Sequence, residues 1–165
     1  MSIVKDISRA VLLRKKGQHT EALAILLDLL KASPIDTKLN YEIACTYDQQ
    51  GLEVDAIPHY EQAIALGIDG EDRRGALLGL GSSYRCVEQY ADAVRTFERG
   101  IAEFPSAHEF NVFLAMALHN LGDHRRALQL LLQHIADHTG DRGTAKFRRV
   151  IFHYAVHLDP SYDNE

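Results

Sequence analysis

A chain of 165 residues is about the length of one globular domain, and its composition, 46% hydrophobic and 25% charged, excludes a disordered chain. The formal net charge of -5 leaves no broad basic surface of the kind that binds nucleic acid. The longest apolar stretch, residues 22–30, is too short to span a bilayer, and Asp28 interrupts it. We therefore expect a protein that binds neither nucleic acid nor a membrane.

The N-terminal segment and the cysteines both indicate a cytoplasmic location. Residues 1–17 lack the long apolar core and the small-residue cleavage site of a signal peptide. The two cysteines, Cys45 and Cys86, lie far apart in the sequence. Such spacing is typical of free thiols in a reducing compartment and not of a disulfide framework.

Helical patterns recur along the chain in pairs, and a glycine marks the turn inside most of these pairs. Gly17, Gly51 and Gly122 each follow an apolar helical stretch, and the first two are 34 residues apart. Glycine at such a turn allows the positive φ of a helix C-cap without a steric penalty. An alanine follows each glycine at the same distance: Ala22, Ala56 and Ala127. We predict repeat units at residues 3–36, 37–70, 74–107 and 108–141.

The third unit keeps this pattern although Glu88 replaces the glycine at its turn. Its first helix carries Leu80-Gly81-x-x-Tyr84 on one face. A small residue such as Gly81 lets two helices approach closely, and Tyr84 can fill the space beside it. We therefore predict that both residues lie on the packing face. The second helix of the unit carries Tyr90-x-x-Ala93-x-x-x-Phe97.

With Pro105 at its end, this pattern resembles the tetratricopeptide repeat. Residues 72–132 are also similar to a small bacterial family of stand-alone tetratricopeptide proteins of unknown function. The resemblance implies an all-α fold, an α-solenoid of four helical hairpins plus a C-terminal capping helix, in a single array over residues 1–158. The other units keep the first-helix motif as Ile43-Ala44-x-x-Tyr47, Leu114-Ala115-x-x-Leu118 and, in its most divergent form, Arg9-Ala10-x-x-Leu13.

The C-terminal residues add one more helical pattern, at 144–158, which no second helix follows. We expect it to be a solvating cap that covers the last repeat. The end of the chain, residues 159–165, is acidic, and we expect a frayed tail there. The apolar side chains that share one face of the cap helix are Phe147, Val150, Ile151 and Tyr154.

The resemblance also implies a concave groove, lined by the first helix of each hairpin, in which partner peptides lie. The side chains that point away from the packing faces of these helices are candidates to line it. They are Ile7, Val11 and Arg14 in the first unit, Tyr41, Cys45 and Asp48 in the second, Leu78, Ser82 and Arg85 in the third, and Val112, Met116 and His119 in the fourth. This row is apolar in its middle and mostly basic at one end, which suits a peptide with apolar anchors and acidic flanks. We therefore predict a protein- or peptide-binding scaffold.

Alternatives stay open for these residues and for the function. Some of the side chains could instead pack against neighbouring helices. Ile7 and Val11 stand where the chaperone-binding clamp, a tetratricopeptide sub-family, requires Lys and Asn, so we do not expect recognition of a C-terminal carboxylate. The alternative to a scaffold is a homodimeric assembly module without a separate partner, which would bury the N-terminal groove or the terminal face. A third alternative is a small-molecule sensor that uses the groove.

No motif indicates catalysis or a bound cofactor. The sequence lacks a phosphate-binding loop, a dinucleotide-binding glycine fingerprint, a nucleophile elbow and a metalloprotease motif. The pairs His134/His138 and His153/His157 have the i, i+4 spacing of two metal ligands on a helix. A closed zinc site needs four ligands, however, and the helix dipole favours histidines near helix C-termini. We therefore predict no metal, no cofactor and no enzymatic activity.

Overall fold

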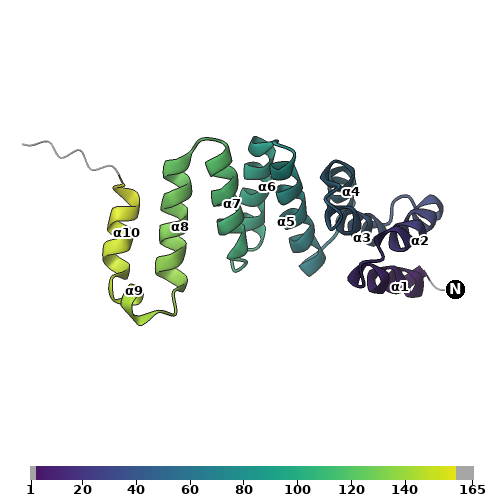
Figure 1. Cartoon of the computed structure of the whole chain (residues 1–165), viewed down its shortest axis with the longest axis horizontal. Coiled ribbons are helices and arrows are strands. Elements are labelled where there is room, and N and C mark those ends of the chain that lie inside the picture. The colour runs from purple at the N-terminus through teal and green to yellow at the C-terminus, as the bar shows by residue number, and fades with distance from the viewer. Residues whose placement is uncertain (1–2, 159–165) are drawn as a thin grey trace, which may run out of the picture. The chain divides into compact units, whose positions relative to one another are not determined.

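The computed structural model describes residues 3–158, so the acidic tail expected at 159–165 lies outside the described residues. Within residues 3–158 all regular secondary structure is helical, which confirms the predicted all-α class (Figure 1). None of these helices is both long enough and apolar enough to cross a membrane. The helices are α1 (Ile3–Lys15), α2 (His19–Ala32), α3 (Thr37–Asp48), α4 (Glu53–Ala65), α5 (Gly70–Cys86), α6 (Tyr90–Glu103), α7 (Glu109–Asn120), α8 (His124–His138), α9 (Arg142–Lys146) and α10 (Arg148–Val156).

The chain divides into two compact structural units, which differ from the repeat units predicted above. They are Met1–Thr96 (unit 1) and Phe97–Glu165 (unit 2), and the boundary lies within α6. In unit 1, α1 packs on α2 and α3 on α4, while α2 also contacts α3 and α4 contacts α5. In unit 2, α7 packs on α8, and α10 packs on α8 as well (Figure 1). This succession of helical hairpins, followed by a terminal helix, is the α-solenoid type of fold that the sequence predicts.

Small buried residues let the helices of unit 1 pack closely. Ala10 on α1 and Ala22 on α2 are fully buried, and so are Ala44 on α3 and Ala56 on α4. Full burial of an apolar side chain of the size of leucine stabilises a fold by roughly 1.5–3 kcal/mol. The larger side chains that fill this core are Leu26, Leu39, Ile43 and Leu77.

The predicted turn glycines adopt left-handed backbone conformations, which confirms their role in ending the first helices. The φ angle is 78° at Gly17, 71° at Gly51 and 92° at Gly122. In the first hairpin the amide of Gln18 donates to the carbonyl oxygen of Leu13 at 3.0 Å, the long hydrogen bond of a Schellman cap.

Glu88 occupies the same conformation in the third hairpin without being a glycine. Its φ angle is 64°, and the amide of Gln89 donates to the carbonyl oxygen of Tyr84 at 2.8 Å. A side chain in this region is strained by roughly 1–2 kcal/mol, because its Cβ atom approaches the following carbonyl oxygen. The turn geometry of the repeat is therefore kept at this position although the residue type does not favour it.

A glycine of α5 marks a close contact between α4 and α5. A Cβ atom added to Gly79 would overlap the phenol ring of Tyr60. Tyr60 is 2% exposed, so its ring fills the space between the two helices. Gly79 lies in the middle of α5 and not at a helix N-terminus, in agreement with a packing role.

Tyr84 contributes less to the core than the sequence predicts. Gly81 is buried in α5 as expected, but Tyr84 is only half-buried. Its hydroxyl donates to the carboxylate of Glu61 on α4. A tyrosine whose hydroxyl finds its partner at the surface keeps that end of the ring exposed to water. The ring that fills the tight space is therefore that of Tyr60.

Aromatic side chains fill the core of unit 2. Phe97 and Phe110 are fully buried, and the ring centroid of Phe97 lies 5.8 Å from that of Phe113. A Cβ atom added to Gly100 would overlap the ring of Phe110, so a small residue is required at this point of α6.

The terminal helix expected over residues 144–158 is two helices, α9 and α10, which meet at Phe147. The α10 helix packs on α8, and its Ala155 is 1% exposed. The Nε atom of Arg148 donates to the carbonyl oxygen of Ala136 on α8 at 2.7 Å. The last hairpin is therefore covered by α10, and its surface on that side is not left open.

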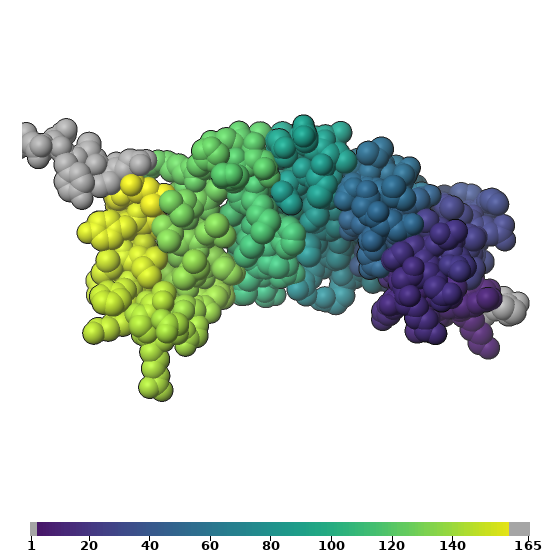
Figure 2. Space-filling model, in the orientation of Figure 1, coloured from purple at the N-terminus to yellow at the C-terminus, as the bar shows by residue number. Residues whose placement is uncertain are grey.

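The apolar face expected on the cap helix exists, but most of it points to solvent. Phe147, Val150 and Tyr154 are 54%, 49% and 56% exposed, whereas Ile151 is half-buried. Figure 2 shows α10, in yellow, at the surface of unit 2 with no described helix over it. The outer surface of the cap is thus apolar, which differs from the solvating surface that we expected.

Candidate partner-binding site

The predicted groove residues fall into two sets, one on α1, α3 and α5 of unit 1 and one on α7 of unit 2. On α1, Ile7 is 8% exposed and belongs to the core together with Leu26 and Leu39. It therefore does not line a groove, because this part of α1 faces α2 and α3. Val11 is half-buried and packs at the edge of the same core.

Arg14 is held in a nearly buried ion pair between α1 and α3. Its Nη1 atom lies 2.7 Å from Oε2 of Glu42, and the two side chains are 10% and 5% exposed. The same nitrogen donates to the main-chain oxygen of Glu42 at 3.1 Å. Arg14 is thus a structural contact of α1 with α3, and it does not form the basic margin that we expected at this end of the groove.

Lys38 extends this contact from α3 to α5. Its ammonium lies 3.0 Å from Oε1 of Glu42 and 2.6 Å from Oδ2 of Asp72. Burial alone would lower the pKa of Lys38, but the hydrogen bonds to Asp72 and Glu42 outweigh it, so that the pKa is raised. Arg14, Glu42, Lys38 and Asp72, here called the charge chain, therefore connect the three first helices of unit 1.

The middle of the predicted row in unit 1 is more polar than the sequence suggests. The Tyr60 hydroxyl donates to Oδ2 of Asp48 at 3.1 Å and lies 3.7 Å from Sγ of Cys45. Burial raises the pKa of both Cys45 and Asp48. A thiol with a raised pKa is mostly protonated at neutral pH and therefore a poor nucleophile.

Tyr41 lies beside this cluster and is held from three sides. Its ring centroid is 6.3 Å from that of Tyr60, and the Lys38 ammonium lies 5.2 Å from the Tyr41 centroid. A Cβ atom added to Gly75 would overlap the Tyr41 hydroxyl, so the glycine at this point of α5 leaves the room that the phenol needs. Tyr41 remains half-buried, which leaves part of its ring available for contact.

The other predicted residues differ in exposure. On α5, Leu78, Ser82 and Arg85 are all half-buried. On α7 in unit 2, Val112 is half-buried, Met116 is 43% exposed and His119 is exposed. The Nδ1 atom of His119 lies 3.0 Å from Nδ1 of His124, so this imidazole pairs with the first residue of α8.

Sequence reasoning missed Lys38, Glu42 and Asp72. One signal was available, because Lys38 and Glu42 have the i, i+4 spacing of an ion pair on a helix. The spacing does not reveal that Glu42 would be buried, since that depends on α1 and α5 covering it.

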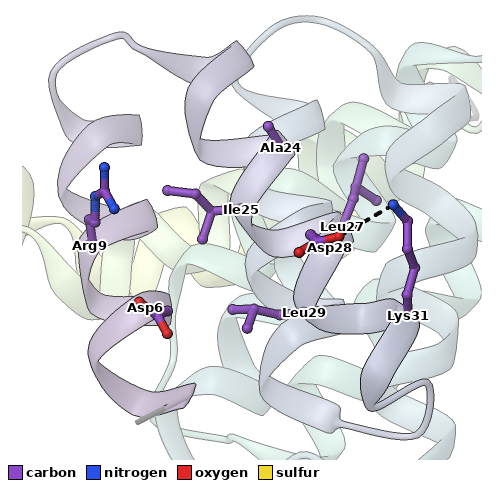
Figure 3. A pocket seen from close by; sticks show the side chains of 8 residues that line it. All are labelled: Asp6, Arg9, Ala24, Ile25, Leu27, Asp28, Leu29 and Lys31. Atoms are coloured by element: carbon purple, nitrogen blue, oxygen red, sulfur yellow. Dashed lines mark hydrogen bonds and ion pairs between the residues drawn. The ribbon is translucent and has the colours of Figure 1, made fainter. Parts of the chain in front are cut away.

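An open pocket of about 700 Å³ lies between α1 and α2, away from the predicted row. Figure 3 shows Ile25 and Leu29 of α2 pointing toward Asp6 and Arg9 of α1. Small-molecule sites enclose most of their ligand, and this open hollow does not. It therefore gives no support to the small-molecule alternative. Its lining residues are Asp6, Arg9, Ala24, Ile25, Leu27, Asp28, Leu29 and Lys31.

The two histidine pairs have a local structural explanation. Nδ1 of His138 lies 3.0 Å from the carbonyl oxygen of His134, and Nδ1 of His157 lies 2.7 Å from that of His153. An imidazole N–H that donates to a carbonyl near a helix C-terminus satisfies an acceptor that the helix leaves open. Over residues 3–158 no three His, Cys, Asp or Glu side chains are grouped so that they could hold a metal ion.

Comparison with known proteins identifies the repeat. The family model described as tetratrico peptide repeat matches residues 37–158. The sequence has no significant match among curated proteins. The solved structure of MamA is 20% identical to this chain with a TM-score of 0.69, covering 95% of this chain and 94% of MamA. That of YrrB, a TPR protein with an unusual peptide-binding site, is 17% identical with a TM-score of 0.67, covering 98% of this chain and 88% of YrrB. Identities this low show similarity of fold alone.

Proposed function

Because the chain belongs to the tetratricopeptide repeat family, we propose that it is a non-catalytic, cytoplasmic scaffold that binds a protein or peptide partner. The partner lies on the side of α1, α3 and α5 that points away from their packing faces. We call this side the first-helix face (Val11, Tyr41, Leu78 and Ser82). The peptide-binding site described for YrrB, a protein of similar fold, supports a peptide as ligand. Both cysteines are free thiols, which supports a reducing compartment.

The charge chain is the observation that carries this proposal. Its ion pairs, at 2.7, 3.0 and 2.6 Å, tie α1 to α3 and α3 to α5. A face whose helices are fixed before binding loses less conformational entropy when a partner docks. The half-buried charges of Lys38 and Asp72 also border the face, with side chains 42% and 40% exposed.

The chemistry of the first-helix face favours a peptide with apolar anchors. Val11, Tyr41 and Leu78 are half-buried, so each offers part of an apolar surface to a partner. Tyrosines in partly enclosed positions often dominate interface energies, because a large rigid ring is desolvated at little entropic loss. Tyr41, enclosed by Tyr60, Lys38 and Gly75, is therefore the central anchor of the proposal.

The test is to recover partners from a native lysate with the immobilised protein and then to measure the affinity of the purified partner. Leu78→Ala and Tyr41→Ala should each weaken binding by about tenfold or more. Val54→Ala is the matched control, since Val54 on α4 is 72% exposed and lies off the first-helix face. Equal affinities for the parent, Leu78→Ala and Tyr41→Ala would exclude the first-helix face as the site.

A homodimeric module is the alternative function, and two exposed apolar residues of α1 favour it. Val4 and Leu12 are 67% and 59% exposed. A dimer that buries this helix would need no separate partner. Light scattering of the purified protein decides between the two functions, because a monomer at all accessible concentrations contradicts the homodimer.

A further inference from the structure

The outward side of α10 is an apolar surface that no described helix covers. Phe147, Val150 and Tyr154, here called the α10 ridge, are 54%, 49% and 56% exposed. They follow one another at i, i+3 and i+7, so they form one line along the helix. Single exposed apolar residues are ordinary on protein surfaces, but a contiguous group of large ones marks an interaction site.

Positive charge lies beside the α10 ridge. From residue 142 to residue 158 the sequence contains no Asp or Glu. The Lys146 ammonium lies 5.8 Å from the centroid of the Phe147 ring, so one charge directly borders the ridge. Arg148 is used in the contact with α8, whereas Arg142, Lys146 and Arg149 are exposed.

These charges disfavour a second copy of the chain as the occupant of the ridge. In a two-fold symmetric contact the same patch lies on both sides, so Lys146 and Arg149 of one copy would come close to the same cations of the other. Like charges opposed across an interface are unfavourable, and here no acidic residue of the segment offsets them. An occupant that places acidic groups beside Lys146 is therefore favoured.

The form of the ridge favours a helix as the occupant. A straight line of side chains at i, i+3 and i+7 is complementary to the groove between side-chain rows of another helix. Packing of helix on helix is also how α3 and α4, and α7 and α8, bury their apolar faces. We propose that the α10 ridge docks an acidic amphipathic α-helix of a partner protein, which places apolar side chains on the ridge and Asp or Glu against Lys146 and Arg149.

An anionic membrane surface is the rival occupant, and the structure favours it less. Helices that lie in a membrane interface present one long apolar face to the acyl chains. The α10 helix has nine residues, and its Ala155 is already buried. Besides the ridge, Val156 is the exposed large apolar side chain that α10 would offer for insertion.

The probe for the experiment is a synthetic acidic amphipathic helix, with leucine at i, i+3, i+4 and i+7 and glutamate at the remaining positions. Its binding to the full chain is measured by fluorescence anisotropy at low and high salt. A peptide of the same composition in scrambled order and a peptide with lysine in place of glutamate are the ligand controls. We expect binding of the acidic helix alone, weakened by salt because the flanking charges are exposed.

Variants of the ridge decide whether the binding occurs there. Phe147→Ser and Tyr154→Ser should each weaken binding about tenfold or more, and Arg149→Glu should weaken it most at low salt. Val54→Ser on α4 and Tyr41→Ala on the first-helix face should leave it unchanged, so this result is independent of the function proposed above. Circular dichroism checks that each variant keeps its helices. Val150→Ser is used in place of any ridge variant that loses its helical signal.

Three outcomes would overturn the proposal. The first is absence of binding of the acidic helix, or binding that the ridge variants do not change. The second is sedimentation of the chain with phosphatidylserine-containing vesicles that Phe147→Ser and Tyr154→Ser abolish, which would assign the ridge to a membrane. The third is a dimer in light scattering that the same variants dissociate, which would assign it to a second copy.

Discussion

The guanidinium of Arg14 contacts the carboxylate of Glu42 at 2.7 Å, although the two residues are 28 positions apart in the chain. Only 10% and 5% of the two side chains are exposed, so water solvates neither charge well enough to replace the other as its partner. Glu42→Ala should therefore lower the free energy of unfolding by about 3–5 kcal/mol, because it leaves Arg14 buried and unpaired. Denaturant titration measures this change.

An exposed ion pair provides the control for Glu42→Ala. Lys31 and Asp28 are 3.4 Å apart, with side chains 78% and 80% exposed. Lys31→Ala should change the stability by less than about 0.5 kcal/mol, since water screens such pairs. If Glu42→Ala had an equally small effect, the ion pair would not be what fixes α1 against α3.

Gly79→Ala should destabilise the protein although alanine is the better helix former. The added Cβ atom overlaps the ring of Tyr60, which is 2% exposed and cannot move to solvent. Overpacking of this kind destabilises by roughly 1–3 kcal/mol, which exceeds the roughly 1 kcal/mol that alanine contributes in a helix. Gly140→Ala is the control, because no atom lies within 4 Å of its added Cβ. A stabilised Gly79→Ala variant would contradict the close approach of α4 and α5.

Glu88→Gly should stabilise the protein by about 1 kcal/mol. Glu88 has a φ of 64°, and glycine relieves the strain of a side chain in this conformation. The gain is offset in part because glycine also makes the unfolded chain more flexible. Gly51→Ala is the reciprocal variant and should be destabilised, since φ at Gly51 is 71°. If the unfolding temperatures of both variants shifted in the same direction relative to the parent, this account of the turns would be contradicted.

The features of the fold that could be predicted from sequence are those with local causes. A left-handed turn needs a residue that tolerates positive φ, so Gly17, Gly51 and Gly122 mark the ends of the first helices from sequence alone. The fixed distance from each glycine to a buried alanine follows from the same repeat, as Ala22 and Ala56 illustrate.

The features that could not be predicted depend on neighbours across the fold. Helical spacing gives the face on which Tyr84 lies, but not that Tyr60 fills the tight space against α5. Arg14 is expected at the surface from its type, and only the approach of Glu42 from α3 explains its burial. In the same way, the pattern of α10 shows that Phe147 and Tyr154 share a face, but not that this face points to solvent.

The stability of the protein should depend on pH through His59. Burial lowers the pKa of His59, and its Nδ1 atom lies 3.0 Å from Oδ1 of Asn40. The imidazole therefore binds a proton more tightly in the unfolded chain than in the folded one. The stability contributed by neutral His59 is present above the unfolded pKa of about 6.5 and is lost as the pH falls through the folded pKa. His59→Gln should therefore show a smaller loss of stability on acidification than the parent. If denaturant titrations showed the free energies of unfolding of the two proteins decreasing equally as the pH falls, this assignment would be contradicted.

Site-specific photocrosslinking tests the proposed partner-binding face most directly. A photoreactive benzoylphenylalanine is introduced at position 82, in place of the half-buried Ser82 of α5, or at position 54, in place of the exposed Val54 of α4. If the first-helix face binds the partner, irradiation in native lysate crosslinks a protein from position 82 and not from position 54. Crosslinks of that protein from position 54 alone would contradict the central claim and would assign the interaction to the second helices.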